Sequence, residues 1–385
     1  MPAPASAACS RAGCSPRSAM RIAASIPERP GSRAAPSPWS AATSRPPARS
    51  SAAWCSIPIS PAGRPSARPR PRMRRSRAPS PTACSSRPSS PCRAEGDAMP
   101  DTSRLWHGLT AEEHEAQYNP RAAVADFADC QARHQGWSAA AAARLTAIRD
   151  VAYAEAPLCT LDIYPVPGLA SAPVHLFFHG GYWRAQDKAN FAFVAEALVA
   201  SGSLAVIANY PLCPAVTLDE VVSAARDAVA WTHRHIAPYG GDPARLTVSG
   251  HSAGAHLTAA ALAEDWPARG LPADIVSRAV LISGIFDPAP AIGTSVNAEI
   301  RLTPDLAARH DFERIPPRIL CPCWIVAGGR EPWHWIDQSF RYAQHLRRHG
   351  GDPGVLVVPG RHHFDILDLV RDEASGLGRI MCGRP

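Results

Sequence analysis

The apolar and polar positions of residues 151–373 divide this part of the chain into short apolar runs and longer amphipathic stretches. The apolar runs predict strands at Val174–Phe178, Leu204–Asn209, Leu246–Ser249, Ala279–Ser283, Cys323–Ala327 and Val355–Val358. Helical periodicity between them predicts helices at Asn190–Ala200, Leu218–His235, Ser252–Glu264, Trp333–His349 and Phe364–Glu373. Because such alternation is typical of strands buried on both faces, we expect an α/β fold with a mostly parallel central sheet covered by helices on both sides.

Two segments precede this alternating region. The pattern from Thr110 to about Arg149 is helical, with a break at Tyr118–Pro120, and predicts a helical N-terminal cap within residues 99–149. Val151–Ala154 and Cys159–Tyr164 alternate with a period of two and predict a hairpin at the edge of the sheet. We therefore expect residues 99–385 to form one domain.

The composition changes sharply before that domain. Residues 1–98 hold 16 arginines and 18 of the 40 prolines, no lysine, and three acidic residues, so the basic balance of the chain belongs to this leader. With few large apolar residues, the leader is expected to be disordered. Its composition is also what GC-rich DNA encodes outside its selected reading frame, so our preferred hypothesis is a mis-called start with Met99 as the true one.

Other interpretations of the leader are weaker. The basic stripe Arg70–Arg77 could attach to nucleic acid or to a membrane surface, and an Arg- and Ser-rich leader could be a transit peptide, although frequent proline opposes the helix that such a peptide needs. The chain has no glycine-rich phosphate fingerprint, so nucleotide binding has no support, and it has no transmembrane run. We expect neither a nucleic-acid partner nor membrane insertion.

The cysteines do not predict a metal centre. Five of the 11 lie in the leader, and the others are scattered; Cys321 and Cys323 are too close in sequence for a zinc pair and are interpreted as buried thiols. We expect neither a metal nor a cofactor, and a reducing cytoplasm is the default location.

The stretch from Val248 to His256 carries the first candidate chemistry. It passes from an apolar run through Gly250-His251-Ser252-Ala253-Gly254 into an alanine-rich helical segment. Glycines two positions on either side of a serine permit the sharp strand-to-helix bend that exposes a nucleophilic hydroxyl. The sequence therefore predicts Ser252 as a nucleophile.

A second glycine pair follows the strand Val174–Phe178. The residues His179-Gly180-Gly181-Tyr182-Trp183 form the kind of loop whose backbone N–H groups stabilise a tetrahedral oxyanion in this architecture. We expect the donors to be the N–H groups of Gly180, Gly181 or Tyr182, together with that of Ala253.

A base and an acid are expected after the last two strands. His363, with His362 as the alternative, follows the last strand, and Glu331 lies in the loop after the preceding one. Asp287 and Asp337 are the alternative acids. The chain order serine, acid, histidine is the order that an α/β-hydrolase uses, and a carboxylate beside the imidazole would orient it and stabilise its charged form.

With these residues placed, the chain from about Thr110 to about Asp372 resembles the kynurenine formamidases (arylformamidases) of the α/β-hydrolase superfamily. The shared stretches are His179–Trp183, Gly250–His256, Gly284–Asp287, Gln338-Ser339 and His363–Ile366. The resemblance implies an α/β-hydrolase fold with Ser252 as nucleophile and His363 as base. It places Glu331 at the acid position, where vertebrate members usually have aspartate.

The activity that this resemblance implies is hydrolysis of N-formylkynurenine through an acyl enzyme on Ser252, with no cofactor. A triad does not distinguish an activated amide from an ester, so a general short-chain carboxylesterase is the alternative. A hydrolase-fold binding protein without turnover is a third hypothesis, disfavoured by the complete set of candidate residues. The expected partner is a small ester or formamide, and a homodimer is common for the fold.

Overall fold

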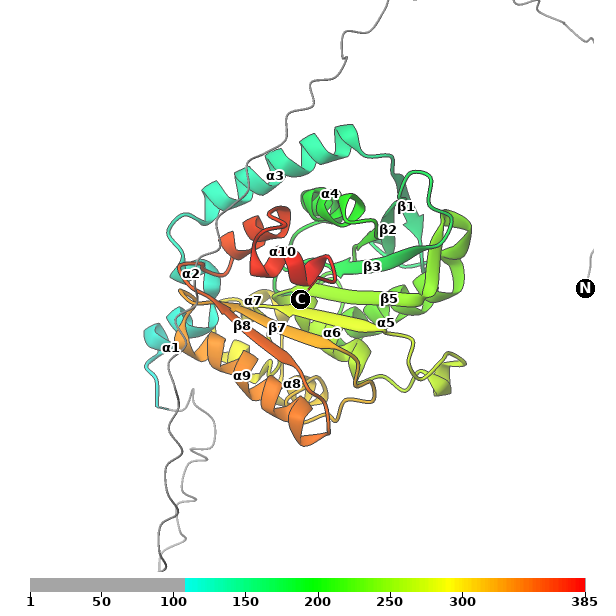
Figure 1. Cartoon of the computed structure of the whole chain (residues 1–385). Coiled ribbons are helices and arrows are strands. Elements are labelled where there is room, and N and C mark those ends of the chain that lie inside the picture. The colour runs from blue at the N-terminus through cyan, green and yellow to red at the C-terminus, as the bar shows by residue number, and fades with distance from the viewer. Residues whose placement is uncertain (1–107, 385) are drawn as a thin grey trace, which may run out of the picture. The chain divides into compact units, whose positions relative to one another are not determined.

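A central sheet of eight strands organises the part of the chain described by the computed structural model, residues 108–384 (Figure 1). The strands are β1 (Ile148–Ala152), β2 (Thr160–Tyr164), β3 (Ala172–Phe178), β4 (Leu204–Ala208), β5 (Gly241–His251), β6 (Arg278–Ile282), β7 (Cys323–Gly328) and β8 (Gly354–Val358), in the order β1-β2-β4-β3-β5-β6-β7-β8. The leader predicted at residues 1–98 lies outside the described residues.

The pairing of the strands confirms the predicted sheet. β1 and β2 form an antiparallel hairpin at one edge, and β2 also pairs antiparallel with β4. The six strands that follow in the sheet, β4-β3-β5-β6-β7-β8, pair in parallel, so their carboxyl ends meet at one edge of the sheet. In an open sheet of this kind, ligands bind beyond those carboxyl ends.

Helices cover both faces of the sheet (Figure 1). On one face α5 (Leu218–His235), α6 (Ala253–Leu262) and α9 (Trp333–Arg348) share an apolar core with the sheet. On the other face lie α3 (Phe127–Arg144), α4 (Ala192–Ala200) and α10 (Gly376–Met381). Strand β3 serves both cores, because Leu176 and Phe178 pack with the first set of helices and Phe177 with the second.

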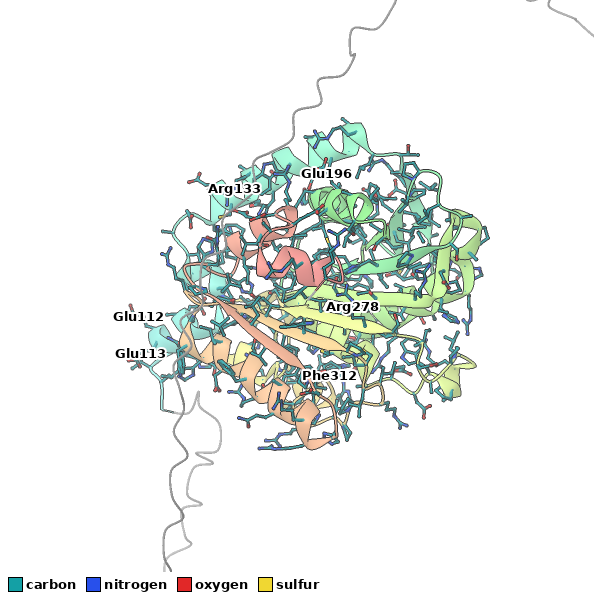
Figure 2. The ribbon with its side chains drawn as sticks, viewed as in Figure 1. Glu112, Glu113, Arg133, Glu196, Arg278 and Phe312 are labelled. Atoms are coloured by element: carbon teal, nitrogen blue, oxygen red, sulfur yellow. The ribbon has the colours of Figure 1, made fainter. Side chains whose placement is uncertain are left out.

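The last helix is tied to the sheet by a half-buried arginine of β6. Arg278 on β6, labelled in Figure 2, donates from Nη1 to the carbonyl oxygen of Ile380 (2.5 Å) and from Nη2 to that of Met381 (2.9 Å). These carbonyls lie at the end of α10, where a cation is favoured by the unpaired carbonyl groups.

Three helical segments precede the sheet and match the predicted helical pattern with its break. The helix α1 (Ala111–Tyr118) starts with a capping box between Thr110 and Glu113, and Asn119 separates it from α2 (Pro120–Ala123). The helix α3 then packs on α4.

Two details differ from the predicted elements. The helix expected at Phe364–Glu373 is a 3₁₀ segment, Asp365–Arg371, in which the Leu367 N–H bonds to the Phe364 carbonyl. The short helices α7 (Asn297–Ile300), α8 (Pro304–Arg309) and α10 were not predicted, because four to six residues are too few to show a helical period.

Candidate active site

Ser252 occupies a strained bend between β5 and α6. Its φ is 56° and its ψ is −118°, a combination that costs a non-glycine residue free energy and persists only where the surroundings enforce it. A Cβ at Gly250 would lie 2.1 Å from the Gly254 carbonyl oxygen, and one at Gly254 would lie 2.0 Å from the Phe178 carbonyl oxygen. The Ser252 N–H is tied to the Ile282 carbonyl of β6 (2.8 Å). The bend thus requires both glycines.

The glycine loop after β3 lies against this bend. A Cβ at Gly180 would come within 3.2 Å of the Ser252 Cβ, so the loop backbone approaches the serine closely. The chain then turns through positive φ values at Gly181 (122°), Tyr182 (54°) and Trp183 (57°). The Tyr182 hydroxyl donates to the carbonyl oxygen of Tyr118 (2.8 Å), which anchors the loop to α1.

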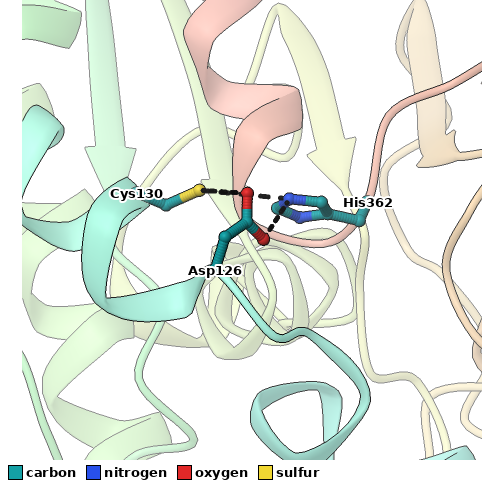
Figure 3. Close-up of side chains that lie close together, drawn as sticks. All are labelled: Asp126, Cys130 and His362. Carbon is teal, nitrogen blue, oxygen red and sulfur yellow. Dashed lines mark hydrogen bonds and ion pairs between the residues drawn. The ribbon is translucent and has the colours of Figure 1, made fainter.

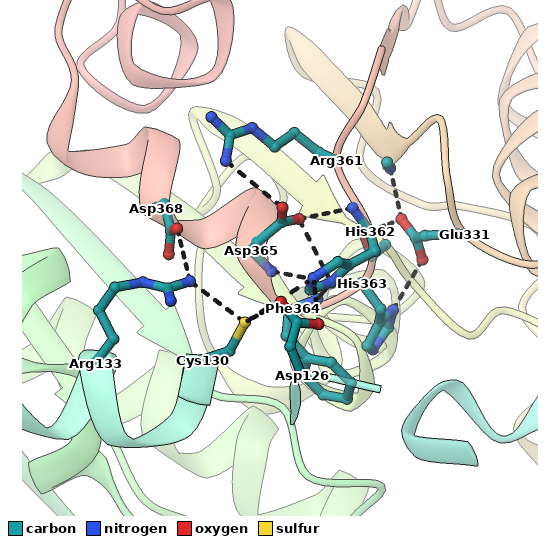
Figure 4. A network of polar contacts seen from close by, with 12 residues as sticks. Asp126, Cys130, Arg133, Glu331, Arg361, His362, His363, Phe364, Asp365 and Asp368 are labelled. Carbon is teal, nitrogen blue, oxygen red and sulfur yellow. Dashed lines mark hydrogen bonds and ion pairs between the residues drawn. The ribbon is translucent and has the colours of Figure 1, made fainter. Parts of the chain in front are cut away.

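His363 and Glu331 form a buried pair. The His363 Nδ1 lies 2.8 Å from Glu331 Oε2, and the side chains are 2% and 0% exposed (Figure 4). The other carboxylate oxygen accepts hydrogen bonds from the Ser283 hydroxyl (2.6 Å) and the Gly328 N–H (2.5 Å). A carboxylate held in this way keeps the neutral imidazole protonated on Nδ1 and leaves its Nε2 free to accept a proton.

The alternative residues from the sequence lie elsewhere. Asp337 pairs with Arg341, and Asp287 Oδ1 accepts from the Ala289 N–H (2.9 Å). The His362 ring is directed to α3, with its Nε2 3.2 Å from Asp126 Oδ1. Of the predicted histidines and acids, only His363 and Glu331 contact each other within residues 108–384.

His251 is a residue that the sequence reasoning missed. It directly precedes Ser252, is 4% exposed, and its Nε2 lies 2.7 Å from the His363 carbonyl oxygen. The two imidazole rings are 4.8 Å apart. Burial holds the pKa of His251 well below its usual range, so the ring is neutral and donates from Nε2. Its position beside the serine is the only sequence signal that could have marked it.

One pocket brings most of these residues together. It has a volume of about 400 Å³, and Gly180, Gly181, Tyr182, Ser252 and His363 all line it. Glu331 lies behind His363, and Ala253 is buried in the first turn of α6. The far wall comes from α2 and α3, so the predicted N-terminal cap contributes to the pocket.

A polar network joins α3 to the segment after β8, beside the pocket (Figure 4). Asp368 accepts from Arg133 Nη2 (2.8 Å), the contact drawn in Figure 4. It also accepts from His134 Nε2 (2.8 Å). Hydrogen bonds from these two residues outweigh burial and lower the pKa of the Asp368 carboxyl. The network fixes α3 next to the His363 loop.

Within residues 108–384, one group of side chains is close enough to share a metal ion. Its members are Asp126, Cys130 and His362, whose ligand atoms lie within 4.8 Å of one another (Figure 3). However, His362 Nδ1 accepts backbone N–H groups from Phe364 (3.1 Å) and Asp365 (3.3 Å), so the proton of the neutral ring is on Nε2. A nitrogen that binds a metal ion carries no proton. The contacts therefore favour a hydrogen bond from His362 Nε2 to Asp126 over a metal site.

The comparisons with known proteins agree with the fold. Residues 175–366 match a family described as the alpha/beta hydrolase fold, and the chain is an enzyme of this class. A solved structure from Silicibacter superposes with a TM-score of 0.59 at 23% identity, over 72% of this chain and 98% of the other. No helix among residues 108–384 has the length and apolar character needed to cross a membrane.

Within the class, the chain belongs to the kynurenine formamidase family, as the sequence resemblance indicated. It is 30% identical to a kynurenine formamidase of Danio rerio over 289 residues, which cover 72% of this chain and 97% of the relative. It is 28% identical to one of Salmo salar over 290 residues, with the same two coverages.

Proposed function

We propose that the protein is a serine hydrolase that removes a formyl group from N-formylkynurenine. The observation that carries the proposal is the buried 2.8 Å contact between His363 Nδ1 and Glu331 Oε2, in a pocket that Ser252 also lines. Two further observations support the proposal. One is the strained bend at Ser252, and the other is the similarity to kynurenine formamidases, which extends over nearly the whole length of those relatives. In this proposal Ser252 is the nucleophile, His363 the base and Glu331 the acid.

The first half-reaction forms an acyl enzyme. His363 Nε2 takes the proton of the Ser252 hydroxyl as its oxygen attacks the formyl carbon, and Glu331 stabilises the imidazolium. The negative charge on the formyl oxygen is bound by N–H groups of the Gly180–Tyr182 loop and of Ala253. The Ala253 N–H is available because the first N–H groups of a helix have no intrahelical partner. The acyl enzyme forms when the bond between the formyl carbon and the aniline nitrogen breaks and His363 gives its proton to that nitrogen, so that kynurenine leaves.

The second half-reaction regenerates the serine. His363 takes a proton from a water molecule that attacks the formyl ester. Formate leaves as the Ser252 oxygen regains its proton from His363. The buried Tyr182, which belongs to the oxyanion loop and lines the pocket, suits an acyl group as small as formyl.

The test compares two substrates with the full chain. We expect kcat/KM for N-formylkynurenine to exceed that for p-nitrophenyl acetate, and Ser252→Ala to lower both at least a thousandfold. Ser171→Ala is the matched control, because Ser171 is exposed and outside the pocket. Negligible formylkynurenine turnover beside ester turnover would replace the formamidase by a short-chain carboxylesterase.

A labelling experiment separates an enzyme with an active serine from a binding protein. A fluorophosphonate probe should label the wild-type chain and not Ser252→Ala, because phosphonylation needs a serine activated by its base. Absence of labelling in the wild type would contradict the proposed mechanism.

A homodimer and a cytoplasmic location are further proposals, to be checked by light scattering and by cell fractionation.

A further inference from the structure

The pocket that contains Ser252 and His363 carries positive charge that its walls leave unbalanced. Of the described residues that line it, two are arginines, Arg121 and Arg184, and none is aspartate or glutamate. Arg184 is already paired, with Nη1 2.5 Å from Glu299 Oε1. Arg121 makes no hydrogen bond or ion pair with any residue in the range 108–384.

The position of Arg121 leaves its donors available. Its guanidinium carbon lies 4.8 Å from the centre of the Phe127 ring, over the ring face. Stacking on a ring uses the face of the guanidinium and leaves the N–H groups in its plane free. A carboxylate matches this planar set of donors and can accept two hydrogen bonds at once.

The rest of the pocket suits an aromatic group next to that charge. Phe127 packs edge-to-face with Phe364 at a ring distance of 4.6 Å, and both line the pocket. Tyr182 and Phe191 add two more rings. The lining thus offers aromatic surfaces for an aryl ring and one cation, Arg121, that has no ionic partner among residues 108–384.

We propose that Arg121 binds a carboxylate on the leaving group, so that the enzyme selects aryl substrates with an anionic side chain. This inference rests on the proposed function, because a formyl acyl group has no place for a carboxylate and the anion must belong to the aniline part. With no carboxylate among the described lining residues, an α-ammonium group has no ionic partner. Selection therefore acts on the carboxylate and not on the amino-acid zwitterion.

The test uses three formamides with the full chain. N-formylkynurenine, its deaminated analogue and its carboxamide differ only in the ammonium or the carboxylate. We expect the deaminated analogue to keep kcat/KM within about threefold of N-formylkynurenine, and the carboxamide to lose about tenfold or more, mainly through KM. Because Arg121 is exposed, this carboxylate preference should shrink as ionic strength rises.

Two variants assign the preference to Arg121. Arg121→Gln should bring the carboxylate-to-carboxamide ratio of kcat/KM close to one, and Arg121→Lys should give an intermediate ratio, because a lysine keeps the charge but not the planar donors. Arg348→Gln removes the same charge from an exposed arginine of α9 that is outside the pocket, and should keep the wild-type ratio.

The outcomes separate this inference from the proposed function. A wild type that hydrolyses all three formamides equally, or an Arg121→Gln variant that keeps the wild-type ratio, overturns the role of Arg121 while the formamidase stands. If no formamide is hydrolysed, the proposed function fails, and the same ratio is then measured with aryl acetates that carry a carboxylate or a carboxamide. A ratio near one in that series also overturns the inference.

Discussion

The imidazole of His251 bonds to the backbone of His363, 112 positions later in the chain. The Nε2 of His251 lies 2.7 Å from the His363 carbonyl oxygen, and the two rings are 4.8 Å apart. One of these histidines directly precedes Ser252 and the other contacts Glu331. A single buried hydrogen bond therefore links the serine bend to the loop of the proposed base.

This link predicts that His251 positions His363. His251→Met removes the donor and should lower kcat about ten- to a hundredfold, the effect of losing one buried hydrogen bond, with little change in KM. His251→Gln, whose amide N–H can reach the same carbonyl, should recover most of kcat. Steady-state kinetics and thermal unfolding of both variants check this. Equal loss in both, in proportion to their loss of stability, would mean that the ring only fills space.

The contacts of Glu331 predict separate effects on activity and stability. Glu331→Gln keeps an oxygen that can accept from Ser283 and Gly328, so the melting temperature should change by only a few degrees. The negative charge beside His363 is lost, and kcat should fall by about 10²–10⁴-fold. Asp337→Asn, at the alternative acid, is the comparison. If it lowers kcat as much as Glu331→Gln does, the acid assignment is wrong.

The close approach at Gly254 predicts a large loss of stability on adding a methyl group. Gly254→Ala places a Cβ 2.0 Å from the Phe178 carbonyl oxygen, both parts of rigid backbone, and should cost roughly 3 kcal/mol or more in the free energy of unfolding. Gly136→Ala, in the middle of α3 with no atom within 4 Å of the new Cβ, should instead stabilise by about 0.5–1 kcal/mol. Denaturant unfolding measures both, and equal values for the two variants would be incompatible with the bend described.

The contacts of Asp368 with His134 and Arg133 predict a pH dependence of stability. The folded-state pKa of Asp368 is below its ordinary value of 3.8, so its contribution is present above that value and is lost as the pH falls through the lower folded pKa. Asp368→Asn should destabilise by about 1–2 kcal/mol at pH 7. The difference from wild type should shrink below pH 4.

The control for this pH dependence is Asp274→Asn, because Asp274 is exposed. Unfolding by urea between pH 3 and pH 7 provides the measurement. An Asp368→Asn penalty that stays constant over this range would show that the ionised carboxyl contributes nothing to the contact between α3 and the segment after β8.

Several features followed from the sequence alone, because they depend on neighbouring residues. Short apolar runs located strands β3 to β8, a period of two located the hairpin at the sheet edge, and a period of 3.6 located the helices α5 and α9. Pro120 marked the break after α1. The glycines around Ser252 predicted the bend, since the close approach of Gly250 to the Gly254 carbonyl lies within five consecutive residues, whereas that of Gly254 to Phe178 does not. The 3₁₀ geometry of the segment after Phe364 and the shortest helices were not predicted, because four to seven residues are too few to show a distinct period.

The contacts of the site were decided by the tertiary structure. The sequence placed two histidines after β8 and three carboxylates on earlier elements, but no local pattern distinguishes neighbours whose side chains point in different directions. The parallel register of β6, β7 and β8 brings His363 to Glu331 and turns His362 toward α3. The docking of α2 and α3 places Arg121 and Phe127 in the pocket wall. Such contacts join residues far apart in the chain, and only the packing of the whole domain determines them.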